Sequence, residues 1–183
     1  MIKAVPHIAN MSPYALAELK APSGKRLISL SQNESLRPPS PMAVDAAAKA
    51  LHNGHLYPDP DWCDLRSNLS ALHRIPAEQI LCGNGSMELI ACLTLAFAAE
   101  GAGVLAPAHA YPFFKRGARV ARARFDTAPE TTAGVSVDAM LDALRPDTRL
   151  VFIANPGNPT GTRIPRDELL RLRNGLPDHV LLV

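Results

Sequence analysis

The sequence predicts an α/β fold whose sheet is mostly parallel. The first observation is that short apolar runs alternate with helical patterns from about residue 80 to the end of the chain. The second is a fully apolar run at residues 150–153, which is typical of a strand covered on both faces. The 183-residue chain is also long enough to bury a sizeable core.

The first thirty residues have little periodic pattern and contain several prolines. They predict an extended arm rather than a packed element. Within the arm we expect a short helix at residues 13–19 and a strand-like run at residues 27–30.

Two helices are predicted next. Ser40 and Pro41 predict the start of the first, because serine can cap free amides and proline suits the first helical turn. Asn53-Gly54 predicts its end. A proline-rich extended turn follows, and Asp61 is the expected cap of the second helix.

The remainder predicts alternating strands and helices. We expect strands at residues 80–82, 104–106, 119–125, 150–153 and 180–183, and helices at residues 86–98, 112–117, 137–144 and 165–173. The helix at 86–98 is apolar almost all round, which predicts that it is buried or packed on a sheet. Ser136 is the expected cap of the helix at 137–144. Four arginines alternate with apolar residues and predict the exposed face of a strand: Arg116, Arg119, Arg122 and Arg124.

Composition excludes several classes of function. The formal net charge of +2 is too small to indicate nucleic-acid binding. No apolar run approaches the ~20 residues that span a bilayer, and the first residues lack a signal-peptide pattern. Cys63, Cys82 and Cys92 match neither a metal motif nor a redox motif, so we expect thiols in a reducing cytoplasm and no metal site.

The loop Gly83-Asn84-Gly85-Ser86 is a candidate anion site. Glycine lets the backbone adopt positive φ and approach a ligand closely. A predicted strand precedes the loop and a helix follows it, so free amides at the helix start would face a bound anion. The alternative is a tight turn capped by serine.

The loop at residues 155–161, Asn-Pro-Gly-Asn-Pro-Thr-Gly, is a second candidate. Its two prolines stiffen the backbone on both sides of Asn158, which follows a buried strand. Ligands bind at the carboxyl ends of such strands, and the Asn158 amide could donate to an oxyanion or phenolate there. Tyr111 follows another strand toward the same edge and could stack on a planar ring, although a half-buried structural tyrosine is the alternative.

Five features in order resemble pyridoxal-phosphate-dependent aminotransferases of fold type I, class I/II, and within them the histidinol-phosphate aminotransferase group. They are Asn33-Glu34, the turn Tyr57-Pro58-Asp59-Pro60, the loop at residues 83–86, the segment 107–111 and the loop at residues 155–161. The resemblance implies a three-layer α/β large domain at residues 31–183, truncated within its sheet, and an N-terminal arm on the small-domain side at residues 1–30.

The resemblance also implies roles for individual residues. The cofactor would be pyridoxal 5′-phosphate. The backbone amides of Gly85, Ser86 and Met87 would hold its phosphate. The Tyr111 ring would stack on its pyridine ring, and the Asn158 side-chain amide would donate to its phenolic oxygen. Met87 stands where the group usually has aspartate. Because the expected contacts are made by backbone amides, this difference in side chain would not remove them.

Other roles involve the substrate and a second subunit. Tyr57 would reach the cofactor phosphate of a neighbouring subunit, which implies a homodimer. Asn33 and Glu34 would lie near the substrate, under the N-terminal arm. The segment Ser35-Leu36-Arg37-Pro38 departs from the Asn-Pro-Tyr-Gly usual in this group, so the amino donor stays open.

The family's cofactor-bearing lysine would lie beyond Val183, so no catalytic residue is assigned and we expect this chain to be an inactive fragment by itself. The implied activity is a cytoplasmic transaminase of amino-acid biosynthesis, in particular histidine biosynthesis, which moves an amino group to a 2-oxo acid. Two alternatives remain: a non-catalytic fragment that binds or dimerises, and a pyridoxal-phosphate-dependent decarboxylase or lyase of the same fold.

Overall fold

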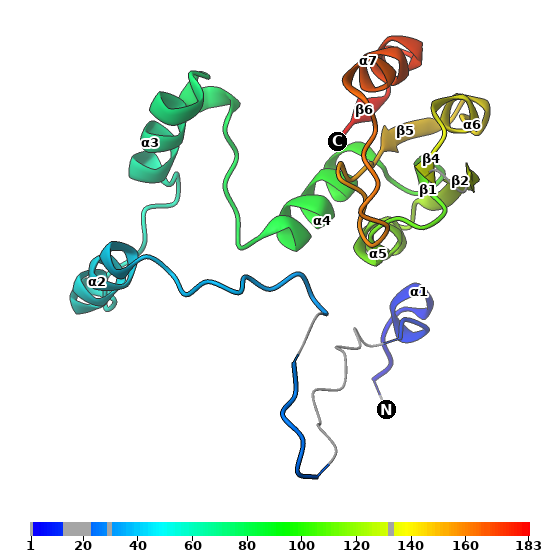
Figure 1. The fold of residues 1–183 in the computed structure, drawn as a ribbon. Coiled ribbons are helices and arrows are strands. Elements are labelled where there is room, and N and C mark those ends of the chain that lie inside the picture. The colour runs from blue at the N-terminus through cyan, green and yellow to red at the C-terminus, as the bar shows by residue number, and fades with distance from the viewer. Residues whose placement is uncertain (1, 13–22, 29–30, 132–133) are drawn as a thin grey trace. The chain divides into compact units, whose positions relative to one another are not determined.

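The computed structural model of the chain describes residues 2–12, 23–28, 31–131 and 134–183 (Figure 1). It divides into two compact units, one formed by Met1–Met11 with Cys82–Val183 and the other by Ser12–Leu81. We call them the sheet unit and the helical unit. The predicted helix at residues 13–19 lies outside the described residues, and so does part of the strand-like run at 27–30.

The sheet unit is built on four parallel strands in the order β2-β1-β5-β6. Their bounds are β1 Gly103–Pro107, β2 Arg124–Ala128, β5 Thr148–Val151 and β6 Leu181–Leu182. The predicted parallel sheet is therefore confirmed. A separate antiparallel pair, β3 (Glu130–Thr131) and β4 (Gly134–Val135), was not predicted.

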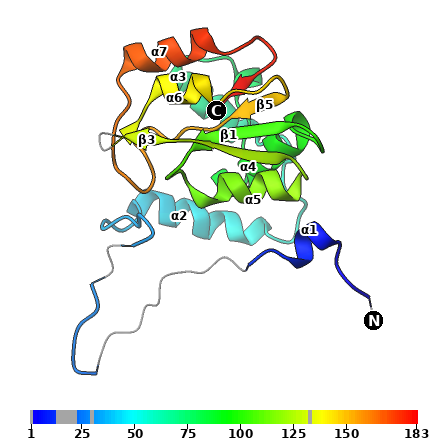
Figure 2. The ribbon, with the colours of Figure 1, turned by 90° about the vertical axis from the view of Figure 1, so that its right-hand side faces the viewer.

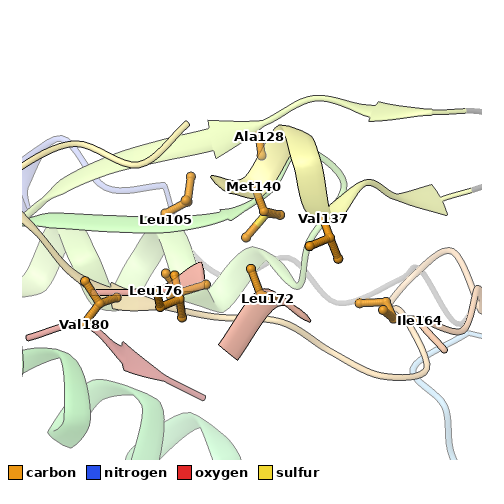
Figure 3. Packing of buried hydrophobic residues seen from close by; sticks show 9 residues of the cluster. Leu105, Ala128, Val137, Met140, Ile164, Leu172, Leu176 and Val180 are labelled. Atoms are coloured by element: carbon orange, nitrogen blue, oxygen red, sulfur yellow. The ribbon is translucent and has the colours of Figure 1, made fainter. Parts of the chain in front are cut away.

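Helices cover both faces of the sheet, α6 (Val137–Asp142) and α7 (Arg166–Gly175) on one and α5 (Pro112–Val120) on the other (Figure 2). The fully buried strand β1 serves both layers, because successive side chains point to opposite faces. Leu105 packs with Met140 and Leu172 in one hydrophobic cluster (Figure 3). Its neighbours Val104 and Ala106 pack in the other cluster, which includes Phe114 and Phe152.

Helix α4 (Ser86–Phe97) has the predicted bounds within one residue, but its burial differs from the prediction. Only Ile90 and Thr94 are buried, where α4 packs against Gly117 of α5. Phe97 is 53% exposed, and Leu95 is exposed as well. An apolar composition therefore overstated how much of this helix packs on the sheet.

Two predicted strands were wrong. Residues 80–82 form no strand, and Leu81 is exposed. The predicted strand at 119–125 is the end of α5, a turn and the start of β2. Arg116 and Arg119 therefore lie on a helix, Arg122 lies in the turn with φ of 60°, and only Arg124 lies on a strand. Alternation of charged and apolar residues did not distinguish these conformations.

The helical unit contains α2 (Pro41–Ala50), α3 (Cys63–His73) and two short 3-10 turns, Leu51–Asn53 and Ala77–Gln79. None of its described residues is buried. Both predicted helices are confirmed, but their caps are not. Ser40 precedes α2 without a side-chain capping bond.

At α3, the capping carboxylate belongs to Asp59 rather than to the predicted Asp61. Its Oδ2 accepts from the amide of Cys63 at 2.7 Å, and its Oδ1 accepts from the amide of Asp61 at 3.0 Å. These backbone hydrogen bonds hold the pKa of Asp59 below its ordinary value. By contrast, the predicted cap of α6 is confirmed, since Ser136 Oγ accepts from the amide of Ala139 at 3.2 Å.

A short helix, α1 (Pro6–Ala9), belongs to the sheet unit, where Arg119 Nε donates to the carbonyl oxygen of His7 at 3.1 Å. Across the described ranges, no helix is long and apolar enough to cross a membrane. The same ranges contain no group of three or more His, Cys, Asp or Glu side chains that could hold a metal ion.

Candidate functional site

A pocket lies just past the carboxyl ends of β1 and β5. Its lining comes from the last residue of β1, from the segments that follow β1 and β5, and from the β3–β4 pair: Pro107, His109, Ala110, Glu130, Val135, Ala154, Gly157, Asn158 and Thr160. In open parallel sheets this edge is where ligands bind. The pocket lies at the edge where the sequence predicted a ligand site, and one of the predicted site residues, Asn158, is among its lining residues.

The loop that carries Asn158 is closed at its base by Asn155. The Asn155 amide donates from Nδ2 to the carbonyl oxygen of Ile164 at 3.2 Å and accepts from the Ile164 amide at its Oδ1 at 2.9 Å. This two-point contact replaces a strand ladder where β5 has ended. It joins the two ends of the loop.

Inside the loop, the backbone folds tightly around Gly157. Its amide donates to the carbonyl oxygen of Thr162 at 2.7 Å, and its carbonyl accepts from the amide of Gly161 at 2.8 Å. The hydroxyls of Thr160 and Thr162 are 2.8 Å apart. A side chain at Gly157 would collide with the Thr160 hydroxyl, so glycine is required there by close packing.

These contacts hold Asn158 half-buried at the pocket wall. Its side-chain amide forms no hydrogen bond with any of the residues that the structure describes. An amide that is held at a pocket wall without a protein partner can donate to a ligand without breaking an existing contact. The predicted role of Asn158 as a donor is compatible with this geometry.

The loop at residues 83–86 leads into α4, as predicted, although no strand precedes it. Gly85 has φ of 86°, and a Cβ built on it would meet nothing within 4 Å. This conformation favours glycine, and the open space lies at the helix start. The Gly85 amide donates to the carbonyl oxygen of Gly83 at 2.8 Å.

The next two amides of this helix start, on Ser86 and Met87, form no hydrogen bond within the described part of the chain. The carboxylate of Glu88 folds back over the loop and accepts from the amide of Asn84. The Ser86 side chain does not cap the helix. This segment therefore offers two free donors, and it does not line the pocket next to Asn158.

Tyr111 lies immediately before α5 and is half-buried. Its ring meets Phe114 edge-on, with centroids 5.7 Å apart, and lies 6.3 Å from the Phe113 ring. Phe114 in turn stacks on Phe152 at 4.6 Å. Tyr111 is thus part of the aromatic packing beneath α5 and is not among the residues that line the pocket.

Two pocket residues were missed by the sequence reasoning, His109 and Glu130. His109 Nδ1 lies 2.5 Å from Glu130 Oε2, and the His109 amide donates to the same oxygen at 2.7 Å. The available signal was positional: each residue comes two residues after a strand, β1 for His109 and β2 for Glu130. Parallel neighbours end at the same edge, which brings both side chains together.

The opposite edge of the sheet has its own charge cluster. Arg124 binds Asp147 and Asp126, with Nη2 to Asp147 Oδ1 at 2.8 Å and Nε to Asp126 Oδ2 at 2.8 Å. The hydrogen bonds from Arg124 lower the pKa of Asp147 to about 2. These residues tie β2 to the segment before β5, so their role is structural.

Asn33, Glu34 and Tyr57, the remaining predicted site residues, belong to the helical unit and are exposed. Asn33 has φ of 55°, a left-handed conformation that asparagine tolerates better than most residues. Their predicted roles involve a substrate and a second subunit, and they stay predictions.

Comparison with known proteins matches residues 25–183 to the sequence family described as aminotransferase class I and II. The chain is 40% identical over 178 residues to histidinol-phosphate aminotransferase from Rhodospirillum rubrum, covering 97% of this chain and 48% of that protein. It is 40% identical over 189 residues to the enzyme of the same name from Hyphomonas neptunium, covering 100% of this chain and 50% of that protein.

Among solved structures, the fold is similar to histidinol-phosphate aminotransferase from Sinorhizobium meliloti in complex with pyridoxal-5′-phosphate. The TM-score is 0.75 at 26% identity, covering 79% of this chain and 39% of that one. This likeness confirms the predicted fold type. The chain spans about half the length of the curated relatives it matches.

Proposed function

Because this chain belongs to the class I and II aminotransferases, we infer that the complete protein transfers an amino group to a 2-oxo acid with pyridoxal 5′-phosphate as cofactor. The predicted resemblance is confirmed at the level of the family. The observation that carries the functional proposal is the unpartnered Asn158 amide, held at a pocket on the carboxyl edge of the parallel sheet.

Two groups of residues fit the cofactor, Asn158 at the carboxyl edge of the sheet and the amides at the start of α4. The Asn158 amide can donate to the phenolic oxygen of the ring, and the free amides of Ser86 and Met87 can donate to the phosphate. Gly85 keeps the approach to these amides open, while its own amide is engaged by Gly83. We therefore assign Gly85 a role in shape rather than in donation.

When bound, pyridoxal phosphate supplies an electron sink for reactions at the substrate's α-carbon, and the protein supplies position and electrostatics. For this chain, that contribution is orientation. Asn155 fixes the base of the loop, the loop fixes Asn158, and the start of α4 supplies donors for a dianionic group. With the cofactor bound, these contacts would hold its ring and phosphate in a fixed orientation.

We propose histidinol phosphate as the amino donor, on the strength of 40% identity to two enzymes of that name. Asn33 and Glu34 would face the substrate. Tyr57, fully exposed in the structure, would reach the cofactor phosphate of a neighbouring subunit, so the working form would be a homodimer in the cytoplasm. Asn33 and Glu34 would thus help to select the substrate, and Tyr57 would link the active site to the neighbouring subunit.

The test of the activity uses the complete protein that the gene encodes, loaded with pyridoxal phosphate. We expect histidinol phosphate to bleach the cofactor's visible absorbance and a 2-oxo acid to restore it. Histidine and aspartate serve as competing donors. No spectral change with any amino donor would contradict amino transfer, and a change with aspartate alone would contradict the proposed donor.

A separate test addresses the phosphate contacts. Ser86→Ala should weaken cofactor binding by about 1 kcal/mol if the hydroxyl also donates. Gly85→Val should weaken it more, because a β-branched residue resists a φ of 86° at the helix start. Equilibrium dialysis measures both. Unchanged affinity in both variants would remove the phosphate from this loop.

A further inference from the structure

We propose that the cavity between α1 and the end of α5 binds a phosphate group, either as inorganic phosphate or as part of a small phosphate monoester. The cavity has a volume of about 440 Å³ and is lined by Pro6, His7, Glu100, Arg119, Arg122 and Ala123. It shares no lining residue with the pocket that contains Asn158. The inference therefore goes beyond the proposed function and does not depend on it.

The cavity lies at the amino edge of the parallel sheet. Glu100 comes shortly before β1, and Ala123 comes directly before β2. The other wall is α1, which lies beside α5 (Figure 2). Small molecules bind in pockets of roughly 300–1,000 Å³. The cavity therefore has room for a phosphate together with a small group that carries it.

The first observation behind the proposal is the guanidinium of Arg119. It donates from Nε to the carbonyl oxygen of His7 at 3.1 Å. Its Nη1 and Nη2 have no partner among the residues that the structure describes. A guanidinium held at Nε presents its two Nη groups as a planar fork. This geometry suits two parallel hydrogen bonds to the oxygens of a phosphate or a carboxylate.

The second observation is that Arg122 has a partner that a ligand can replace. Its Nε donates to His7 Nδ1 at 3.4 Å, and its Nη1 lies 3.3 Å from Glu100 Oε2. The Glu100 side chain is 76% exposed and that of Arg122 is 50% exposed. An ion pair between groups so open to water contributes little to stability. A phosphate can therefore take the place of the Glu100 carboxylate on Arg122.

The third observation is a donor on His7. Because Nδ1 accepts from Arg122, the proton of the neutral ring lies on Nε2, which has no partner in the described ranges. Two arginines and one glutamate give the lining a net positive charge. A phosphate monoester has three acceptor oxygens for these three donor residues, whereas a carboxylate has two. The donor set therefore favours phosphate over a carboxylate.

A bound phosphate would also fasten α1 to the sheet unit. None of the four residues of α1 is buried, and the two hydrogen bonds described from Arg119 and Arg122 both go to His7. A ligand held between His7 and the arginines adds contacts on both sides of this junction. The amides of Ala9 and Asn10, which donate to carbonyl oxygens of the same helical turn, would then exchange with solvent more slowly.

The backbone at Arg122 allows binding to be separated from stability. α5 ends in a Schellman motif, in which the Ala123 amide donates to the Ala118 carbonyl oxygen at 2.9 Å and the Arg122 amide to that of Arg119 at 3.2 Å. Arg122 has φ of 60° at the left-handed position of this motif, where glycine is favoured. Arg122→Gly therefore removes the guanidinium and relieves backbone strain in one substitution.

The test uses the complete protein saturated with pyridoxal phosphate, so that added phosphate does not enter the cofactor site. Isothermal titration calorimetry at constant ionic strength measures the affinity for inorganic phosphate and, separately, for glycerol phosphate. We expect Arg119→Gln and Arg122→Gly each to weaken binding about tenfold, the effect of losing hydrogen bonds from a charged group. Glu100→Gln should strengthen binding about twofold, because the competing carboxylate is removed.

Two further measurements read the site without a titration. The melting temperature of Arg122→Gly should rise by about 2 °C in the absence of phosphate. Phosphate should slow amide exchange at Ala9 and Asn10 in the wild type but not in Arg122→Gly. Arg74→Gly is the matched control, because Arg74 has the same left-handed conformation at the end of α3 and lies outside the cavity.

The outcomes decide the proposal. Tighter binding of glycerol phosphate than of inorganic phosphate would identify a monoester as the ligand, and the reverse order would identify the free ion. No binding of either at millimolar concentration would overturn the proposal, and so would an affinity unchanged in both Arg119→Gln and Arg122→Gly. A tenfold loss in Arg74→Gly would place the phosphate elsewhere. A lower melting temperature in Arg122→Gly with unchanged affinity would make Arg122 a structural residue and contradict the site.

Discussion

The helices of the two units are stabilised in different ways. In the sheet unit, the helices lie on a parallel sheet and contribute to two hydrophobic clusters. In the helical unit, α2 and α3 form although none of the unit's described residues is buried. Their ends are instead defined by local features, such as proline at the first turn of α2 and the Asp59 carboxylate before α3.

The difference shows where stability and recognition lie. Local signals are enough to start and stop a helix, but each contributes little, and isolated helices of this length are marginal in water. Burial on a sheet contributes more, because each covered side chain leaves water. The candidate cofactor pocket belongs to the sheet unit. The predicted substrate and subunit contacts belong to the helical unit, where the backbone has fewer tertiary constraints.

The largest expected effect is in the core of the sheet unit. Phe152 is fully buried and stacks on Phe114, so Phe152→Ala should lower the free energy of unfolding by about 3–5 kcal/mol. Leu72→Ala, at an exposed position of α3, should change it by about 0.5 kcal/mol or less. Urea unfolding followed by circular dichroism measures both. Equal losses would break the distinction between the two units.

The next effect concerns the loop at the pocket. Asn155→Ala removes two hydrogen bonds to Ile164 and should destabilise the protein by about 1–2 kcal/mol. Asn158→Ala removes no hydrogen bond to a described residue and should be nearly neutral for stability while weakening cofactor binding. A melting temperature that falls equally in both variants would mean that Asn158 supports the loop rather than a ligand.

A pH effect is expected at the amino edge of the sheet. The folded pKa of Asp147, about 2, lies below its ordinary value of 3.8 because Arg124 hydrogen-bonds the ionised form. Asp147 therefore stabilises the fold above about pH 4, and this contribution is lost as the pH falls toward 2. In the Asp147→Asn variant, the free energy of unfolding should depend less on pH between about 4 and 2. Asp178→Asn, at an exposed aspartate, is the control. An equal loss of pH dependence in this variant would contradict the assignment of the effect to Asp147.

The smallest effect is at the start of α3. Asp59→Ala should open the first turn of this helix, because the Cys63 amide loses its acceptor. We expect a few-fold faster amide exchange at Cys63 and its neighbours. Exchange in β1 of the sheet unit should not change. Asp61→Ala is the control that distinguishes the observed cap from the predicted one, and a larger effect there would restore Asp61 to this role.

The sequence predicted elements whose signals are local. The Ser136 cap, the proline at the start of α2, the glycine at the start of α4 and the apolar run at 150–153 each depend on neighbours in the chain. The order of the loops was also sufficient to identify the family. These features are governed by φ, by capping and by periodicity, which a sequence displays directly.

The tertiary structure decided what depends on distant neighbours. Arg122 and Arg124 share one charge pattern but differ in conformation, because only Arg124 pairs with a neighbouring strand. Phe97 is as apolar as Phe152, yet it is exposed, because the sheet covers one side of α4 only. His109 and Glu130 are 21 residues apart and meet because β1 and β2 are parallel neighbours that end at the same edge. A residue's own chemistry sets what it can bind, whereas strand order and register set which partner it meets.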